Sequence, residues 1–302
     1  MTQKERNRRL AERVRRRDFF VAPGVYDMFS ARLADRMGFE AIYMTGYGTV
    51  AAHLGLPDAG LASYRDMVER VAVTAGGTMT PLIADADTGY GGLLNVRQTV
   101  RGYERAGASA LHMEDQIEPK RCGHSPGTRV IPIEDMVTRL KVALDARQDD
   151  NFLIIARTDA RASLGFDEAC RRGEAYAKAG ADAVFLDALR SEDELAALPK
   201  RVDAPILANM GGLTPIQSAE RMRTLGYALA IYPGAAQSAA VHAIQRVYDG
   251  LKRDGSTLNI DVPRLGLQEM HALVGFPEVW AFEEKWYGPA DATKARRAGV
   301  GE

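Results

Sequence analysis

Cysteine is scarce in this sequence, and long apolar runs are missing from it. Two cysteines, Cys122 and Cys170, in a chain of 302 residues cannot form the disulfide framework of a small secreted protein. No apolar stretch reaches the roughly 18 residues needed to cross a membrane, and the residues up to Asp18 lack the apolar centre of a secretory signal. We therefore expect a soluble, cytoplasmic protein with no membrane partner.

An excess of charge of either sign is also missing. The 39 Lys and Arg residues against 40 Asp and Glu residues leave a net charge of −1, so the overall charge does not favour nucleic acid as a partner. A local exception is a run of seven arginines and Lys4 within the first seventeen residues, in which Leu10 and Val14 stand four positions apart. Because no aromatic residue accompanies this run, we predict a short helix over 1–18 with one apolar stripe and a solvated basic face, rather than an RNA-binding arm.

Segments of one kind recur along the chain, each ending a helix at a glycine and continuing as an apolar strand. They cover 37–45, 106–114, 179–187 and 225–233, with Gly38, Gly107, Gly180 and Gly226 at the expected helix ends. Further apolar runs lie between them, at 19–23, 81–87, 152–158 and 205–209. The intervening stretches have helical apolar spacing, so strand and helix alternate through eight units of roughly 30 residues.

This alternation is typical of a parallel sheet covered by helices. We predict the α/β class and a (β/α)8 TIM barrel forming a single domain over 1–302, with an N-terminal helix at 1–18 and a C-terminal helical extension at 253–302. An open doubly wound sheet is the alternative, but eight units favour closure into a barrel.

Polar residues stand at the expected carboxyl ends of the strands, where the chemistry of such a barrel gathers. A barrel core needs none of them, and neighbouring acids at one rim destabilise a fold unless a cation binds. We therefore predict that the site is built from these strand ends, which carry Tyr43, Thr45, Asp85, Asp87, Glu114, Asp115, Arg157, Asp159, Asp187 and Asn209.

The acidic residues among these predict a metal site. Asp85 and Asp87 are two positions apart and so point to the same side of a strand, and Glu114 ends the neighbouring strand. Oxygen ligands without histidine or thiolate suit Mg²⁺, or Mn²⁺, better than zinc. Asp58, in the loop after the second strand, could join through water. The alternatives are that the paired aspartates only cap a turn and that Asp58 is a solvated loop acid.

A long loop rich in Gly, Pro and charge follows the fourth strand, and this composition is typical of a mobile cover over a site. Cys122 lies at its centre, between Lys120, Arg121 and His124. Nearby positive charge lowers a thiol pKa, so we expect Cys122 to be a reactive thiolate or a proton donor rather than an inert hydrophobe. Cys170, by contrast, has the spacing of a helix core residue. His112 is interpreted as a structural strand residue.

Five segments resemble, in order and position, the isocitrate lyase and phosphoenolpyruvate mutase superfamily: MTGYGTVAAHLGLPDAG, DADTGYGG, HMEDQIEPKRCGH, IIARTDA and PILANM. The similarity runs from about Phe19 to Pro233. It is greatest to the short branch of methylisocitrate lyases, 2,3-dimethylmalate and other 2-alkylmalate lyases, and carboxyvinyl-carboxyphosphonate phosphonomutases. The resemblance implies a Mg²⁺-dependent barrel that acts on 2-hydroxy or 2-oxo carboxylates.

The resemblance also implies roles for single residues. It places the metal on Asp85 and Asp87, with Glu114 and Asp58 acting largely through water. It implies that Arg157 is a cationic clamp and that Cys122 is the acid that protonates the departing carbanion. Asp187 stands where the family usually has glutamate, and we count it among the catalytic residues. The substrate-binding residues implied are Tyr43, Thr45, Gly46, Tyr47, Gly123, His124 and Asn209.

We predict a carbon–carbon lyase that cleaves a 2-hydroxy di- or tricarboxylate, of the 2-methylisocitrate or 2-alkylmalate type, to pyruvate or glyoxylate plus a carboxylate. The alternatives are a phosphonomutase, with Asp58 as nucleophile, an oxaloacetate hydrolase or decarboxylase, and a non-catalytic barrel. Tyr47 replaces a small family residue and is expected to narrow the pocket. The loop after Asn209 is shorter than in the family and lacks its glutamate, which leaves the substrate open.

The C-terminal extension is rich in aromatic residues, namely Phe276, Trp280, Phe282, Trp286 and Tyr287. This much aromatic surface after barrel closure suggests packing on another subunit, and the alternative is a tail folded over its own barrel. In the family this region carries a helix exchanged between subunits of a tetramer. We therefore expect a homo-oligomer, a homotetramer by the resemblance.

Overall fold

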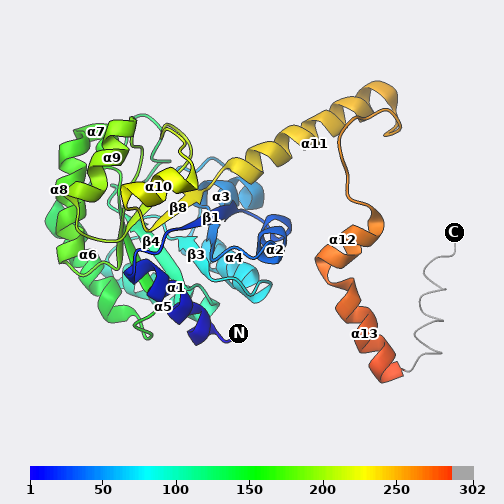
Figure 1. The fold of residues 1–302 in the computed structure, drawn as a ribbon, viewed down its shortest axis with the longest axis horizontal. Coiled ribbons are helices and arrows are strands. Elements are labelled where there is room, and N and C mark those ends of the chain that lie inside the picture. Colours follow the sequence, from blue (N-terminus) through cyan, green and yellow to red (C-terminus); the bar gives the residue numbers. More distant parts are fainter. Residues whose placement is uncertain (288–302) are drawn as a thin grey trace. The chain divides into compact units, whose positions relative to one another are not determined.

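Eight parallel strands form a closed barrel in the computed structural model, which describes residues 1–287 (Figure 1). Each strand pairs with the next along the chain, and β1 pairs with β8 to close the ring. The predicted barrel is confirmed, and the doubly wound alternative is wrong. The strands are β1 Phe20–Val25, β2 Ile42–Met44, β3 Leu82–Asp85, β4 Ala110–Glu114, β5 Leu153–Thr158, β6 Ala183–Leu186, β7 Ile206–Asn209 and β8 Leu229–Tyr232.

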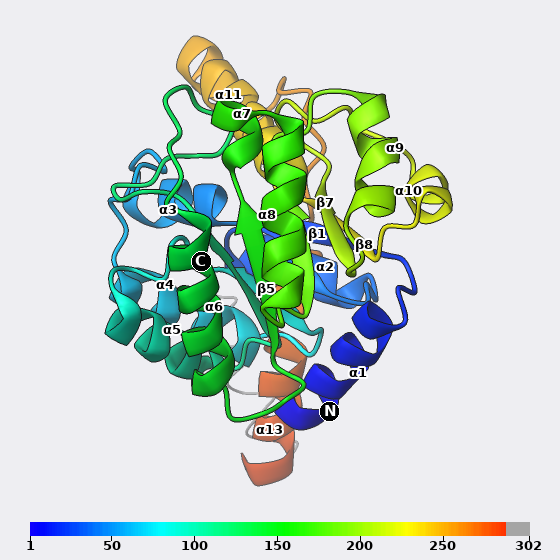
Figure 2. The same ribbon diagram turned by 90° about the vertical axis from the view of Figure 1, so that its left-hand side faces the viewer.

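Helices connect the strands and surround the barrel; Figure 2 shows α8 lying across β5. The four recurring glycines, Gly38, Gly107, Gly180 and Gly226, all follow helices and have φ between 74° and 103°, in the left-handed region that glycine adopts without strain. The helices of this part are α1 Gln3–Arg15, α2 Met28–Arg36, α3 Gly46–Leu54, α4 Tyr64–Gly76, α5 Leu93–Ala106, α6 Ile133–Ala146, α7 Ala160–Leu164, α8 Phe166–Lys178, α9 Glu192–Arg201 and α10 Ala219–Leu225, and α11 Ala235–Asp254 follows β8.

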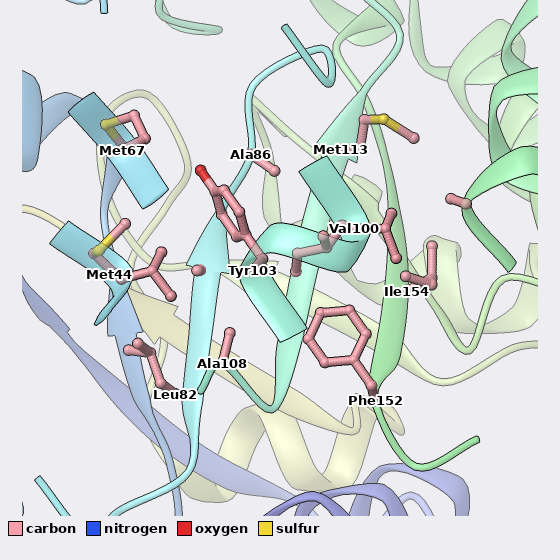
Figure 3. Packing of buried hydrophobic residues seen from close by; sticks show 14 of the residues in the cluster. Met44, Met67, Leu82, Ala86, Val100, Tyr103, Ala108, Met113, Phe152 and Ile154 are labelled. Atoms are coloured by element: carbon pink, nitrogen blue, oxygen red, sulfur yellow. The ribbon is translucent and has the colours of Figure 1, made fainter. Parts of the chain in front are cut away.

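The core has an inner and an outer layer. Inside the barrel, Tyr43, Ile83, Ile155 and Phe185 pack together, and outside it the strands pack on the helices. Figure 3 shows part of the outer layer, where Tyr103 of α5 lies among buried strand and helix residues. Cys170 is fully buried in the outer layer on the opposite side, as its helical spacing predicted.

Helix α1 packs against the inner core through Leu10, Ala11 and Val14. Its arginines bind barrel residues: for example, Arg6 donates to the carbonyl oxygens of Ala75 and Thr78. The basic run therefore belongs to a helix with a buried apolar stripe, as predicted. Its basic face is not wholly solvated, however, because Arg6 forms hydrogen bonds with other parts of the fold.

The chain divides into two compact units, 1–241 and the part from His242 onward, and α11 spans the division. The second unit contains α12 Leu267–Val274 and α13 Phe276–Tyr287, so the predicted helical extension is present. Helix α13 has no buried residue among those described. The boundary at residue 253 and the intersubunit role stay predictions, and 288–302 lie outside the described residues. Among residues 1–287, no helix is both long and apolar enough to span a bilayer.

Candidate active site

A cavity of about 480 Å³ opens at the carboxyl ends of the strands. Strand register assembles its polar residues: Glu114 of β4 stands opposite Arg157 of β5, Arg157 opposite Phe185 of β6, and Asn209 of β7 opposite Ile231 of β8. The cavity is lined by Tyr43, Thr45, Tyr47, Asp58, Asp85, Cys122, Gly123, His124, Arg157, Phe185, Asp187, Asn209, Met210, Gly211, Gly212, Ile216, Ile231, Tyr232, Pro233, Gly234, Ala235, Gln237 and Ser238.

Arg157 is the buried cation at the floor of this cavity. Its Nη2 lies 2.9 Å from Asp159 Oδ1 and 2.7 Å from Asp187 Oδ2, and its Nη1 lies 3.3 Å from Glu114 Oε2. The guanidinium also lies over the ring of Phe185, 5.1 Å from its centroid. These contacts fix the orientation of the guanidinium fork, and a fixed fork is suited to binding a carboxylate.

Asp187 is ionised in this setting. Burial alone would raise the pKa of Asp187, but the Arg157 guanidinium and hydrogen bonds from His124 and Asn209 hold it well below its usual range. The amide of Asn209 donates to Asp187 Oδ1 at 2.9 Å, and His124 Nε2 lies 3.3 Å from the same oxygen. Although it is one methylene shorter than glutamate, Asp187 therefore reaches both Arg157 and His124.

The loop after β4 lies closed over the cavity. The backbone N–H of Cys122 donates to the carbonyl of Asp58 at 3.1 Å, and Leu213 N–H donates to His124 Nδ1 at 3.2 Å. Gly123 lies against the Arg157 cluster so closely that a Cβ there would overlap the carboxylates of Asp159 and Asp187. Loops from three different strands thus meet at Cys122, Gly123 and His124.

The lowered pKa predicted for the Cys122 thiol is wrong, whereas the alternative role of proton donor stays a prediction. Burial raises the pKa of the Cys122 thiol above its ordinary value, and a hydrogen bond from the His124 backbone and the charge of Arg157 offset this only in part. The neighbouring cations do not stabilise a thiolate: Lys120 binds aspartates, and Arg121 is exposed and donates to the Pro126 carbonyl. The geometry therefore favours a protonated thiol that can donate a proton, and not a thiolate.

Lys120 lies buried among the four predicted metal residues. Its Nζ forms ion pairs with Asp58 and, at 2.6 Å, with Asp87 Oδ1. Burial would lower the pKa of Lys120, but the surrounding carboxylates Asp87, Glu114, Asp85 and Asp58 raise it well above its ordinary value. Four carboxylates therefore surround the ammonium group of Lys120, and its positive charge offsets part of the repulsion among them.

Asp85 is held from several sides. Its Oδ2 accepts the backbone N–H of Gly46 at 3.2 Å and lies 3.5 Å from the Tyr43 hydroxyl, while its Oδ1 accepts the N–H of Asp87 at 3.0 Å. The Tyr43 hydroxyl also lies 2.8 Å from His112 Nε2. His112 is therefore a buried strand residue, as predicted, and it contacts Tyr43, which lines the cavity.

Glu114 fits a site that takes a cation or water. Its side chain is fully buried, and neither carboxylate oxygen accepts a hydrogen bond from the described residues. Burial raises the pKa of Glu114 well above its ordinary value in spite of Arg157. Such a carboxylate would be stabilised in its ionised form by a nearby hard cation, and Mg²⁺ uses one or two direct carboxylates and several waters. Within residues 1–287, no three His, Cys, Asp or Glu side chains converge as direct ligands.

Most of the predicted site residues line the one cavity, and five do not, namely Gly46, Asp87, Glu114, Asp115 and Asp159. Gly46 lies behind Asp85, where a Cβ would come within 2.5 Å of its Oδ2. Asp87 faces a second cavity together with Lys120, and Glu114 is fully buried and lines neither cavity. Asp115, at the same strand end, is structural: it accepts hydrogen bonds from Thr158, Arg172 and Tyr176.

The sequence reasoning missed the far wall of the cavity. This wall comes from the end of β8 and from the segments that follow β7 and β8, and its members include Met210, Ile216, Ile231, Tyr232 and Pro233. Apart from their position at or after the ends of predicted strands, these residues carry no chemical signal. Burial among the strand ends also raises the pKa of Asp159 to about 6, against the pull of Arg157.

Fold and site together define a (β/α)8 barrel with a buried arginine in its cavity and acidic residues at the carboxyl ends of its strands. The family model described as phosphoenolpyruvate phosphomutase matches residues 10–252, and the chain belongs to this family. It is 41% identical over 268 residues to 2,3-dimethylmalate lyase of Eubacterium barkeri, covering 88% of this chain and 93% of the relative. It is 39% identical over 291 residues to a 2-methylisocitrate lyase of Aeropyrum pernix, covering 96% and 91%. The predictions of the superfamily and of a carbon–carbon lyase are confirmed.

Solved structures agree with this placement. An oxaloacetate acetylhydrolase in complex with 3,3-difluorooxalacetate superimposes with a TM-score of 0.89 at 33% identity, covering 95% of this chain and 99% of the other. A 2,3-dimethylmalate lyase of the PEP mutase/isocitrate lyase superfamily has a TM-score of 0.87 at 36% identity, covering 93% and 95%. A phosphonopyruvate hydrolase in complex with oxalate and Mg²⁺ has a TM-score of 0.85 at 32% identity, covering 95% and 100%.

Proposed function

We propose that this chain is a Mg²⁺-dependent lyase that cleaves a 2-hydroxy di- or tricarboxylate into pyruvate or glyoxylate and a second carboxylate. The observation that carries the proposal is that the Cys122 thiol lines the same cavity as Arg157 and Asp85. In this proposal Cys122 is the proton donor, Arg157 is the anion clamp and Asp85 is an edge of the acid cluster, and all three border one substrate-sized space. The two lyase relatives support the same reaction class.

The metal proposal rests on the donor set. Asp85 and Asp87 would hold Mg²⁺, or Mn²⁺, with Glu114 and Asp58 acting largely through water. The Glu114 oxygens accept no hydrogen bond from the described residues, although Oε2 lies 3.3 Å from Arg157 Nη1, and they fit this arrangement. When bound, the ion supplies Lewis-acid polarisation of the substrate hydroxyl and the carboxylate beside it. Oxalate and Mg²⁺ occur together in the structure of the phosphonopyruvate hydrolase, which is consistent with this chemistry.

The chain's own residues would bind the substrate and control its charge. Arg157 clamps a carboxylate and stabilises the negative charge that develops on the departing enolate. Tyr43, Thr45 and Tyr47 would contact the 2-oxo acid half, and Gly123, His124 and Asn209 the rest of the substrate. Gly46 would act through Asp85, which accepts its backbone N–H. Asp187 acts as a positioning residue, because it holds Arg157 and His124.

Cys122 would complete the reaction. As the carbon–carbon bond breaks, the substrate hydroxyl would become the carbonyl of the released oxo acid and give its proton to a carboxylate of the acid cluster. The electron pair of the broken bond remains on the departing fragment, the Cys122 thiol delivers its proton to that carbon, and the resulting thiolate is reprotonated before the next turnover. Because the thiol pKa is raised by burial, the acid form is present at neutral pH. The closed loop excludes water, which would weaken the contacts of Arg157 with the developing charge.

The test is a product-release screen with the full chain and Mg²⁺. We expect pyruvate or glyoxylate from 2-methylisocitrate, 2,3-dimethylmalate or another alkylmalate, and none after chelation of the metal. Oxaloacetate tests the hydrolase activity of one structural neighbour, and phosphonopyruvate tests the mutase reaction. Release from none of these compounds would refute the proposal. Absence of heat on titration with Mg²⁺ and oxalate would refute every metal-dependent version of it.

Two variants separate the lyase from the mutase. Replacing Cys122 by Ser should lower turnover by about 10²- to 10⁴-fold, the usual contribution of a general acid, whereas a phosphoryl transfer would be indifferent to it. Asp58→Ala should remove a mutase activity outright. Cys170→Ala, which removes the other thiol from the core, is the control and should keep turnover while it lowers stability.

We also propose that the protein is a cytoplasmic homotetramer assembled through its C-terminal extension. The exposed aromatic residues of α13, such as Phe282 at 59% and Trp286 at 64%, support association. Size-exclusion chromatography with light scattering tests this, and a monomer at micromolar concentration would contradict it.

A further inference from the structure

Gln116 is a buried glutamine at the base of the loop that closes over the cavity. Its backbone forms an antiparallel bridge with Val130, which holds the two ends of the loop together. Beside this bridge, the backbone N–H of Ile117 donates to the carbonyl of Arg129 at 2.9 Å. The Gln116 side chain is only 1% exposed, so its polar groups need partners inside the protein.

Two of these partners are the backbone groups of Arg121, five residues further along the same loop. The N–H of Arg121 donates to Gln116 Oε1 at 3.0 Å, and Gln116 Nε2 donates to the Arg121 carbonyl at 2.7 Å. The paired contact holds the peptide groups on both sides of Arg121. It therefore fixes the chain directly before Cys122, which lines the cavity.

The third partner is Asp159, which also holds Arg157. Gln116 Nε2 donates to Asp159 Oδ2 at 3.1 Å, and Arg157 Nη2 donates to Asp159 Oδ1 at 2.9 Å. Asp159 is itself fixed, because it is 1% exposed and its backbone N–H donates to Asp115. A chain of hydrogen bonds thus runs from the closed loop through Gln116 and Asp159 to the guanidinium of Arg157.

These bonds require an amide side chain at position 116. The amide of a glutamine has one oxygen that accepts and an NH2 group that donates twice, and Gln116 uses all of these groups. An ionised glutamate could accept from Arg121, but it could donate to neither the Arg121 carbonyl nor Asp159. It would also place a second negative charge against the carboxylate of Asp159, which is unfavourable in a buried site.

From this geometry, and resting on the proposed roles of Cys122 and Arg157, we propose that Gln116 is a positioning residue for the reaction. Its amide ties closure of the loop to the orientation of the Arg157 guanidinium. Closing the loop over the cavity therefore also sets the group that clamps the substrate carboxylate. Gln116 does not line the cavity, so it acts only through Arg121 and Asp159.

The first experiment follows the loop without any substrate. Gln116→Met keeps a side chain of similar length and removes its three hydrogen bonds. We expect trypsin to cleave the full-length variant after the buried Lys120 about tenfold faster than the wild type, or more. Gln98→Met, at an exposed position of α5, is the matched control and should be cleaved at the wild-type rate. An unchanged rate in Gln116→Met would overturn the proposal.

The second experiment separates positioning from a merely structural role. Gln116→Glu and Asp159→Asn should each lower kcat/KM, the first by about tenfold or more, because each breaks the link to Arg157. In the double variant, the amide introduced at position 159 can donate to the carboxylate introduced at position 116. We therefore expect the double variant to have a higher kcat/KM and slower cleavage after Lys120 than Gln116→Glu alone.

The outcomes distinguish this proposal from the lyase proposal. A double variant no better than Gln116→Glu in either measurement would overturn the coupling through Asp159. Folded Gln116→Met with wild-type kcat and KM would show that the amide is only structural, which also overturns the proposal. Failure of the wild type to cleave any of the screened compounds would instead refute the lyase proposal, and the trypsin measurements would still test the link between loop and amide.

Discussion

A single added methyl group at Gly123 should open the closed loop. A Cβ at this position would overlap carboxylate oxygens of Asp159 and Asp187 and lie 2.7 Å from Arg157 Nη2. Gly123 is not in the left-handed region of φ, so alanine meets no backbone strain and the whole cost is steric. The overlapped atoms belong to a buried ion cluster that is fixed by several contacts, and they cannot simply rotate away.

The expected magnitude follows from overpacking. Forcing one methyl group into a packed site costs about 1–3 kcal/mol, which corresponds to roughly 5- to 150-fold in an equilibrium constant. The cost falls on the closed state of the loop, so Gly123→Ala should lower kcat/KM by a factor in this range. The free energy of unfolding should change less, because the loop can relieve the overlap by opening.

The assay combines kinetics with limited proteolysis. Lys120 is buried in the closed loop whereas Arg121 is exposed, so trypsin cleavage after Lys120, compared with cleavage after Arg121, reports how often the loop leaves the cavity. Gly123→Ala should be cut faster than the wild type. The matched control is Gly76→Ala at the end of α4, where a Cβ meets nothing within 4 Å. A Gly123→Ala protein with wild-type kcat/KM and an unchanged cleavage rate would refute the closed-loop geometry.

Three further outcomes are expected. Because burial raises the Cys122 pKa above its ordinary value of 9.0, the thiol stays protonated at neutral pH. The alkaline fall of kcat should therefore begin above pH 9 and be absent in Cys122→Ser. A fall of kcat near pH 7 would contradict this role of the thiol. Asp115→Ala should lower the free energy of unfolding by about 3–5 kcal/mol in urea, because it leaves Arg172 without its buried carboxylate, whereas exposed Asp145→Ala should stay within about 0.5 kcal/mol. Glu114→Gln should weaken Mg²⁺ binding by about 10- to 100-fold in calorimetry, and unaltered affinity would remove Glu114 from the metal site.

Most of the fold could be predicted from short-range patterns in the sequence. A glycine that ends a helix and an apolar strand that follows it are both short-range features of a sequence. Gly107 and Gly180 are examples, because each adopts the left-handed conformation that this pattern predicts. The ring closure was predictable from the number of units, since the strands pair in chain order. The polar strand ends became a candidate site because parallel strands bring their carboxyl ends to one rim.

Side-chain direction was the part that the sequence could not supply. Lys120 and Arg121 flank Cys122 in the chain and suggested a thiolate, yet one points into the acid cluster and the other into solvent. Asp87 lies two residues from Asp85 but has a positive φ of 46°, so the strand alternation no longer applies and its carboxylate faces the second cavity. Spacing rules hold within a regular strand and fail where the strand ends.

The same reasoning explains why specificity is harder to predict than reaction class. The groups proposed for the chemistry, such as Arg157 and Cys122, are polar residues in unusual places, so they stand out in a sequence. The apolar residues that border the same cavity, such as Ile216 and Ile231, have the types of any core or surface residue, and only the fold shows that they lie beside it. Their effect on the choice of substrate depends on shape and position, which residue type alone does not give.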